Sequence, residues 1–320
     1  MLKSLTLTAA LLPALAFAEP AIVYSTGGKF DKSFNEGAWT GAKAWAAESG
    51  EGFAEFEIEN IAQSEQALRQ FARRGNDPIV AIGFTHAEAM AKVAPEFPDV
   101  NFTIVDMIVD APNVQSIVYR EQEGSYIVGR MAAMKSESGV LGFVGGMDIP
   151  LIRRFACGYR QGAASVSEDV EVLVTMTGVT PAAWSNPGKG AEITRGQIAD
   201  GADIIMQAAG GTGVGVLQAA ADAGKLGIGT DSNQNGLHPG LIFTTMLKRV
   251  DVAVQKAFSD WSPGIQSLGV AERGIGFALD DNNRALLTAE IEAAGWKAAY
   301  DIASGAVEVH DFTMTGDCPY

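Results

Sequence analysis

A chain of 320 residues is long enough for one large domain or two medium ones, each with its own hydrophobic core. With 47% hydrophobic and only 19% charged residues, the chain is too apolar and too weakly charged to be disordered along its length. Its 38 acidic residues outnumber its 23 basic ones and give a net charge of -15. Because such a charge repels phosphate groups, nucleic acids and anionic lipid surfaces are excluded as expected partners.

The first residues have the layout of a secretory signal peptide. Lys3 precedes an apolar stretch over residues 5–17, and the sequence A-F-A at 16–18 is an A-x-A cleavage site. We therefore expect residues 1–18 to be removed and the mature protein to start near Glu19. Because no cysteine stands at the cleavage site, we expect a periplasmic protein that is not lipid-anchored. No later stretch is apolar for long enough to predict a transmembrane helix.

After the signal, short apolar runs alternate with segments of helical period, which is typical of a parallel α/β sheet covered by helices on both faces. Helices are predicted between the strands. The predicted strands, in chain order, are 21–24, 79–83, 102–105, 117–118, 140–144, 170–176, 204–207, 226–229 and 242–245.

The pattern of helix and strand repeats once along the chain. A predicted helix over 63–75 leads into one strand, and a predicted helix over 193–201 leads into a corresponding one. In each unit the following strand ends on an aspartate, Asp106 or Asp231. Two similar lobes explain this repeat more simply than one sheet of nine or more strands. Because ligands bind beyond the carboxyl ends of parallel strands, we expect both aspartates to face one cleft between the lobes.

The segment after the first strand reads D-K-S-F-N-E at 31–36, and its last four residues fit a capping box. This predicts Ser33 as the N-cap of a helix, with Phe34 and Asn35 in its first turn at the edge of the cleft. There an aromatic ring can stack on a planar ligand, and an amide can form hydrogen bonds with the donors and acceptors at the edge of that ligand. The alternative for Phe34 is a side chain that packs into the core.

A second aromatic side chain, Trp184, lies in a Pro- and Gly-rich loop over 180–190. A large aromatic residue on such a loop is less easily explained as core. One aromatic residue from each lobe could sandwich a flat heterocycle, and stacking on a base is worth roughly 1–3 kcal/mol.

Three charged residues that follow predicted strands could form hydrogen bonds with a sugar. Asp106 and Asp231 could accept hydrogen bonds from vicinal hydroxyls, and Lys248 could donate to the same sugar. Hydrogen bonds to charged groups are worth about 1.5–3 kcal/mol each. The alternatives are helix capping for the aspartates and a solvated surface position for Lys248.

Signatures of catalysis and of cofactor binding do not emerge. The glycine-rich run at 210–215 fails the dinucleotide pattern G-x-G-x-x-G because Val216 stands at its last position, so we interpret it as a strand-to-helix turn. No Walker A, G-x-S-x-G or H-E-x-x-H motif occurs, and the three histidines are far apart. A nucleoside-cleaving enzyme would need a metal-ligating acidic cluster or a placed nucleophile, and the acidic pairs of the sequence do not form such a cluster. We expect no enzyme, no cofactor and no metal.

The two cysteines, Cys157 and Cys318, could form one disulfide in an oxidising compartment or remain free. The sequence leaves both states open.

The sequence resembles the basic membrane protein family of ABC-transporter substrate-binding proteins, the PnrA-like purine nucleoside receptors. The resemblance lies in D-K-S-F-N at 31–35, Asp106, the glycine turn at 210–215, G-T-D at 229–231 and M-L-K at 246–248. The resemblance covers nearly all of the chain after the signal. It implies a type I periplasmic binding protein, an α/β protein with two doubly wound parallel-sheet lobes joined by a three-segment hinge that closes on the ligand. Lobe 1 is expected to comprise 19–117 plus 246–267, and lobe 2 118–245 plus 268–320.

The resemblance also implies roles for individual residues. The stacking aromatics would be Phe34 and Trp184. The contacts to the base or another polar edge would be Asn35 and Asp106. The residues facing the ribose would be Gly211, Asp231 and Lys248. Further candidates are Ser25 and Asp31; because relatives commonly carry an aspartate where Ser25 stands, we expect recognition of the base edge to differ here.

The function that the resemblance implies is capture of a purine nucleoside by a monomer, for an ABC permease and its ATPase subunits in the inner membrane. Two alternatives stay open. The ligand could be a free purine base or another flat heterocycle, such as a flavin, or the protein could be a sensory nucleoside receptor.

Overall fold

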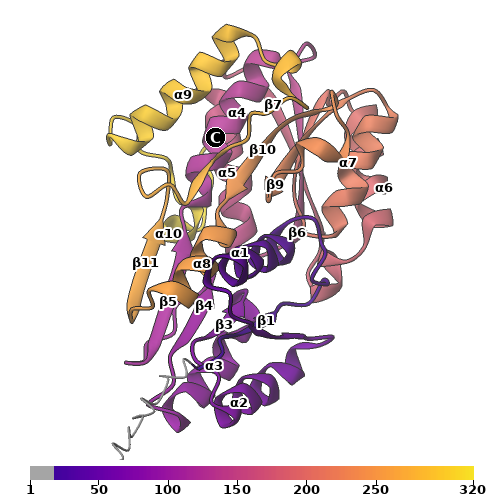
Figure 1. The fold of residues 1–320 in the computed structure, drawn as a ribbon. Coiled ribbons are helices and arrows are strands. Elements are labelled where there is room, and N and C mark those ends of the chain that lie inside the picture. Colours follow the sequence, from indigo (N-terminus) through magenta and orange to yellow (C-terminus); the bar gives the residue numbers. More distant parts are fainter. Residues whose placement is uncertain (1–17) are drawn as a thin grey trace, which may run out of the picture.

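The computed structural model describes residues 18–320, and the predicted signal peptide falls almost entirely outside them. Two six-stranded sheets form two lobes, the first below the second in Figure 1. The first sheet has the order β11-β5-β4-β3-β1-β2 and contains β1 (Ala21–Tyr24), β2 (Ala54–Glu57), β3 (Ile79–Ile82), β4 (Phe102–Val105), β5 (Val114–Tyr119) and β11 (Gly264–Leu268). The second has the order β12-β10-β9-β8-β6-β7 and contains β6 (Val140–Met147), β7 (Glu171–Gly178), β8 (Ile204–Ala208), β9 (Leu226–Asp231), β10 (Ile242–Lys248) and β12 (Ile275–Phe277).

The two sheets share one strand order, which confirms the repeat seen in the sequence. In chain order, β1 to β5 take the same places in the first sheet as β6 to β10 take in the second. These strands pair in parallel, whereas the added outer strands differ, since β11 is parallel to β5 and β12 is antiparallel to β10. Each sheet is therefore doubly wound, and its carboxyl edge is where a ligand site is expected.

Helices cover the sheets, and nearly all residues of the central strands are buried, as parallel strands with helices on both faces should be. The first lobe carries α1 (Phe34–Ser49), α2 (Ser64–Arg74), α3 (Ala87–Val93) and α8 (Val250–Ser259). The second carries α4 (Glu121–Lys135), α5 (Pro150–Ala164), α6 (Pro187–Ala199), α7 (Thr212–Asp222), α9 (Ala289–Ala303) and α10 (Phe312–Thr315). Between residues 18 and 320, none of the helices has the length and apolar character needed to span a bilayer.

The chain passes between the two sheets three times, after β5, after β10 and after β11. The boundaries expected at 117/118 and 245/246 fall inside strands. β5 continues to Tyr119, which pairs with Leu268 of β11, and β10 continues to Lys248, which pairs with Ile275 of β12. The end of ladder pairing thus sets the crossing points after Tyr119 and Lys248.

Helices α4 and α5 of the second lobe approach each other backbone to backbone. A Cβ at Gly158 would collide with the carbonyl oxygen of Gln122, and one at Gly162 with that of Tyr126. Only glycine permits this approach. It fixes the first turns of α4 against the second half of α5.

The C-terminal segment is tied to α5 by a disulfide between Cys157 and Cys318, which settles the question that the sequence left open. The Cα atoms lie 5.6 Å apart, within the usual range for a disulfide. Arg154, one turn before Cys157, also donates to Asp311 at 2.9 Å. The last residues therefore hold α5 through a covalent bond and an ion pair.

Candidate functional site

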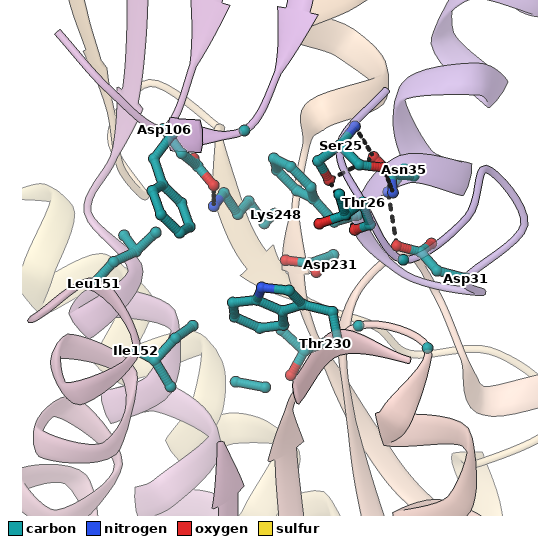
Figure 2. A pocket seen from close by; sticks show the side chains of 18 of the residues that line it. Ser25, Thr26, Asp31, Asn35, Asp106, Leu151, Ile152, Thr230, Asp231 and Lys248 are labelled. Carbon is teal, nitrogen blue, oxygen red and sulfur yellow. Dashed lines mark hydrogen bonds and ion pairs between the residues drawn. The ribbon is translucent and has the colours of Figure 1, made fainter. Parts of the chain in front are cut away.

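A cavity of about 680 Å³, counting the space open to solvent, lies where the carboxyl ends of the strands of both lobes meet. Side chains from both lobes point into it (Figure 2). All nine residues singled out in the sequence line this cavity: Ser25, Asp31, Phe34, Asn35, Asp106, Trp184, Gly211, Asp231 and Lys248. Which of them contact a ligand stays a prediction.

Asp31 organises the turn that leads into α1. Its carboxylate accepts hydrogen bonds from the backbone N–H groups of Ser33 (2.8 Å), Asn35 (3.0 Å) and Glu36 (3.1 Å). Ser33 stands at the predicted N-cap position, but its side chain makes no capping bond, so the capping box is corrected here. Burial raises the pKa of Asp31 to about 7, although the hydrogen bonds from the three backbone N–H groups act to lower it. We conclude that Asp31 caps α1 in place of Ser33.

The side chain of Ser33 instead reaches the opposite lobe. Its hydroxyl donates to Asp231, with Oγ and Oδ2 2.6 Å apart. In return Ser232 Oγ donates to the carbonyl oxygen of Ser33 at 2.6 Å, and Gln234 Nε2 donates to that of Lys32 at 2.9 Å. These bonds join the turn before α1 to the end of β9, so the lobes are closed on each other.

Asn35 has no hydrogen-bonding atom left for a ligand. Its Oδ1 accepts from Ser25 N (3.2 Å) and Ser25 Oγ (3.1 Å), and its Nδ2 donates to the carbonyl oxygens of Ser25 (3.3 Å) and Gly28 (3.1 Å). In this structure Asn35 therefore holds the turn, and its expected contact to a base edge stays a prediction. Two cavity-lining hydroxyls that the sequence did not single out, Thr26 Oγ1 and Thr85 Oγ1, are buried without a partner among residues 18–320.

The two aromatic residues line the cavity from opposite lobes, and each is half-buried. Trp184 ends a short 3-10 helix, Pro181–Trp184, and its indole lies against Gly146, where a Cβ would collide with the ring. Phe34 lies against Gly83, where a Cβ would be 3.6 Å from Phe34 Cε1. Glycine at 146 thus leaves room for the indole at the wall of the cavity, whereas a Cβ at 83 would make ordinary van der Waals contact with Phe34.

Lys248 is the centre of a buried charge cluster rather than a surface residue. Its Nζ lies 2.7 Å from Asp106 Oδ2 and 3.0 Å from Glu121 Oε1, and only 2% of its side chain is exposed. The ammonium also lies 5.0 Å from the ring centroid of Phe34. The resemblance implied that Asp106 contacts the base and that Lys248 contacts the ribose. In the structure these two side chains bind each other (Figure 2).

Burial and an excess of carboxylates determine how these groups ionise. Burial raises the pKa of Asp106 to about 6, although Lys248 opposes the shift, and burial also raises the pKa of Asp231. Burial alone would lower the pKa of Lys248, but Asp106, Glu121 and Asp231 outweigh it and raise that pKa. The lysine stays charged among more carboxylates than it can neutralise. Such a site suits a neutral ligand that donates hydroxyl groups, and it disfavours phosphate.

Asp106 and Asp231 occupy equivalent places in the repeat, and both have a left-handed backbone, with φ of 71° and 70°. This region costs a non-glycine residue energy, although aspartate tolerates it better than most. The carboxylate of Asp106 bonds to Lys248, and that of Asp231 bonds to Ser33. Neither carboxylate therefore caps a helix, which was the alternative. Strain repeated at two strand ends facing one cavity is typical of a binding site.

One wall of the cavity was missed in the sequence. Leu151, Ile152 and Phe155 line it from the first turns of α5, and Figure 2 shows Leu151 and Ile152 turned toward the cavity. The repeat carried the signal that could have found them. Helix α5 follows β6 as α1 follows β1, and the first turn of α1 holds Phe34.

Comparison with known proteins gives a consistent result. The family model described as "ABC transporter substrate-binding protein PnrA-like" matches residues 19–302. The ABC transporter nucleoside-binding protein BmpA of Lactococcus lactis is 30% identical over 317 residues, which cover 90% of this chain and 88% of that protein. An uncharacterized lipoprotein of Pyrococcus furiosus is 31% identical, covering 80% of this chain and 69% of that one.

Among solved structures, a solute-binding protein of an ABC transporter system from Aeropyrum pernix superposes with a TM-score of 0.83. It is 28% identical, and the match covers 92% of this chain and 93% of that one. This likeness confirms the expected type I periplasmic binding fold. Since the relative from Pyrococcus furiosus is named a lipoprotein, the expectation of a protein without a lipid anchor stays a prediction.

Proposed function

The chain belongs to the PnrA-like family of ABC transporter substrate-binding proteins, and on that premise we propose that it captures a purine nucleoside between its lobes. As the substrate-binding component of such a transporter, it delivers a small ligand to a permease driven by an ATPase. We propose further that it works in the periplasm as a monomer without a lipid anchor, after removal of residues 1–18, and that it converts nothing.

One observation carries the choice of ligand. The cavity combines an aromatic side chain from each lobe, Phe34 and Trp184, with the buried group of Asp106, Asp231 and Lys248. Two rings suit the faces of a flat base, and a carboxylate-rich group suits the hydroxyls of a ribose. A neutral nucleoside satisfies both parts of the site, whereas a nucleotide would bring phosphate to a site rich in carboxylates.

The test is direct titration of the purified protein by calorimetry. Inosine, adenosine and guanosine should bind, hypoxanthine should bind more weakly because it lacks the sugar, and inosine 5′-monophosphate should bind more weakly than inosine. Incubation with inosine should release no hypoxanthine. Tight binding of riboflavin or of a free base with no response to nucleosides would overturn the proposal.

Replacing Trp184 with alanine should weaken nucleoside binding by roughly 10- to 100-fold, because one stacking face of the base is lost. The measurement is the calorimetric Kd. Trp296→Ala, at a half-exposed tryptophan on α9 outside the cavity lining, is the matched control and should leave the Kd unchanged. Equal affinities of Trp184→Ala and wild type would remove Trp184 from the ligand.

Replacing Asp231 with alanine should weaken inosine binding more than hypoxanthine binding, because the carboxylate is proposed to accept hydroxyl groups that only the nucleoside has. Ser33→Ala serves as a control for the bond between the lobes, since it removes the Ser33 hydroxyl and keeps the carboxylate. It should weaken both ligands by the same factor. Equal losses for both ligands in Asp231→Ala would show that Asp231 does not contact the sugar.

A further inference from the structure

Lys248 has two carboxylate partners that belong to different lobes. Asp106 follows β4 of the first sheet, and Glu121 is the first residue of α4. Helix α4 packs against β10, which ends at Lys248, and against β12 and α5 of the second lobe. The pair of Lys248 with Glu121 therefore lies within one lobe, whereas the pair of Lys248 with Asp106 crosses the cleft.

Glu121 is itself held from several sides. Its Oε1 lies 3.0 Å from Lys248 Nζ, and its Oε2 accepts from Arg154 Nη1 at 2.9 Å. The same Arg154 nitrogen donates to the carbonyl oxygen of Tyr119, and Arg154 Nη2 donates to Thr313 Oγ1 at 2.6 Å. The carboxylate is fully buried at the N-terminus of α4, where the helix dipole favours negative charge.

From this arrangement we infer that Glu121 is a positioning residue, which holds the Lys248 ammonium at the cleft surface in the open protein, ready for the hydroxyl groups of the ligand. Opening the lobes takes Asp106 away from Lys248 and leaves Glu121 beside it. The Asp106 pair then forms on closure and joins the two lobes. Both residues stand where the chain crosses between the sheets, Glu121 after β5 and Lys248 at the end of β10. The inference rests on the proposed function, because it assigns Lys248 to the ligand.

The test is a double-mutant cycle with Glu121→Gln, Lys248→Met and the double variant, measured as the Kd for inosine. Glutamine keeps the shape of the side chain and removes its charge. We expect Glu121→Gln to weaken binding about tenfold or more when Lys248 is present, and by less than about twofold in the Lys248→Met background. Glu121→Asp, which keeps the charge, should recover part of the loss. An equal loss in both backgrounds would show that Glu121 does not act through the lysine.

Glu123→Gln is the matched control. Glu123 lies in the same turn of α4, but it pairs with Arg120 and accepts from Val270 N at 2.7 Å, away from the cavity. This variant should change the Kd for inosine by less than about twofold. If Glu123→Gln weakens binding as much as Glu121→Gln does, the effect comes from any charge change at the start of α4, and Glu121 is not a positioning residue for Lys248.

Unfolding of the same four proteins of the cycle provides a test that needs no ligand. If Glu121 and Lys248 are partners, their substitutions should be strongly non-additive in the free energy of unfolding. Additive effects overturn the inference even if nucleosides bind. Failure of wild type to bind any nucleoside would instead overturn the proposed function, and the unfolding cycle would still decide whether the two residues are coupled.

Discussion

Replacing Lys248 with methionine should lower the free energy of unfolding by about 3–5 kcal/mol, the usual cost of removing one partner of a buried ion pair. Methionine fills a similar volume but leaves Asp106, Glu121 and Asp231 without their common cation. Chemical denaturation measures the loss. The same variant should weaken inosine binding by roughly 10- to 100-fold, because a charged donor to the sugar is gone.

The loss of stability in Lys248→Met should depend on pH. Asp106 has a pKa of about 6 with the lysine present, and the lysine lowers that pKa, so it should rise further in the variant. A carboxyl whose pKa is higher in the folded than in the unfolded state favours folding when protonated. The deficit should therefore be smaller at pH 5 than at pH 8. A deficit that is equal at both values would mean that unpaired carboxylates are not its cause.

Lys297→Met is the matched control for this charge removal. Lys297 lies on α9 and forms an exposed pair with Asp301 one turn away. The free energy of unfolding of this variant should stay within about 0.5 kcal/mol of wild type at both pH values. If both lysine variants lose the same stability, burial of Lys248 is not the reason for its effect.

Replacing both cysteines with serine should lower the free energy of unfolding by about 2–5 kcal/mol. The disulfide joins residues 161 positions apart, so it restricts a long loop of the unfolded chain. It also keeps the residues around Asp311 against Arg154, which in turn holds Glu121. Denaturation of the variant and of wild type, each with and without a reductant, measures the effect.

Reductant should destabilise wild type to the level of the double serine variant and leave that variant unchanged. Thiol titration of unfolded, unreduced wild type should find no free thiol. Two free thiols per chain, or a wild type that unfolds alike with and without reductant, would show that Cys157 and Cys318 are not joined in solution.

The central strands could be predicted from the sequence because they are uniformly apolar and lie between helices. The strands Ala21–Tyr24, Ile79–Ile82 and Phe102–Val105 are buried at every residue, and each was predicted within one residue of its bounds. The missed strands β2, β11 and β12 lie at the outer positions of their sheets. There a strand is short or partly exposed, so its sequence does not carry a run of apolar residues.

The candidate site was predicted as a set of residues, but many of their contacts were not. The repeat, the turn over 31–36 and the loop that carries Trp184 are local patterns; with the family resemblance, which added Ser25 and Gly211, they gave nine residues that line one cavity. The hydrogen bonds of those residues depend on geometry. Asn35 is an obvious candidate for hydrogen bonds to the edge of a base, yet in the structure its amide forms hydrogen bonds with Ser25 and Gly28. Glu121 gave no signal, because a glutamate at the start of a helix is ordinary.

The α/β class, the duplicated lobes and the family could be predicted from the amino acids alone, because apolar periodicity and short motifs are properties of neighbouring residues. The three-dimensional fold was needed to show that Lys248 pairs with Asp106, 142 positions away, and with Glu121. The fold also showed that Ser33 bonds to Asp231 across the cleft rather than capping its own helix. A buried charge takes the partner that folding brings within about 3 Å of it, and distance along the chain says nothing about which partner that is.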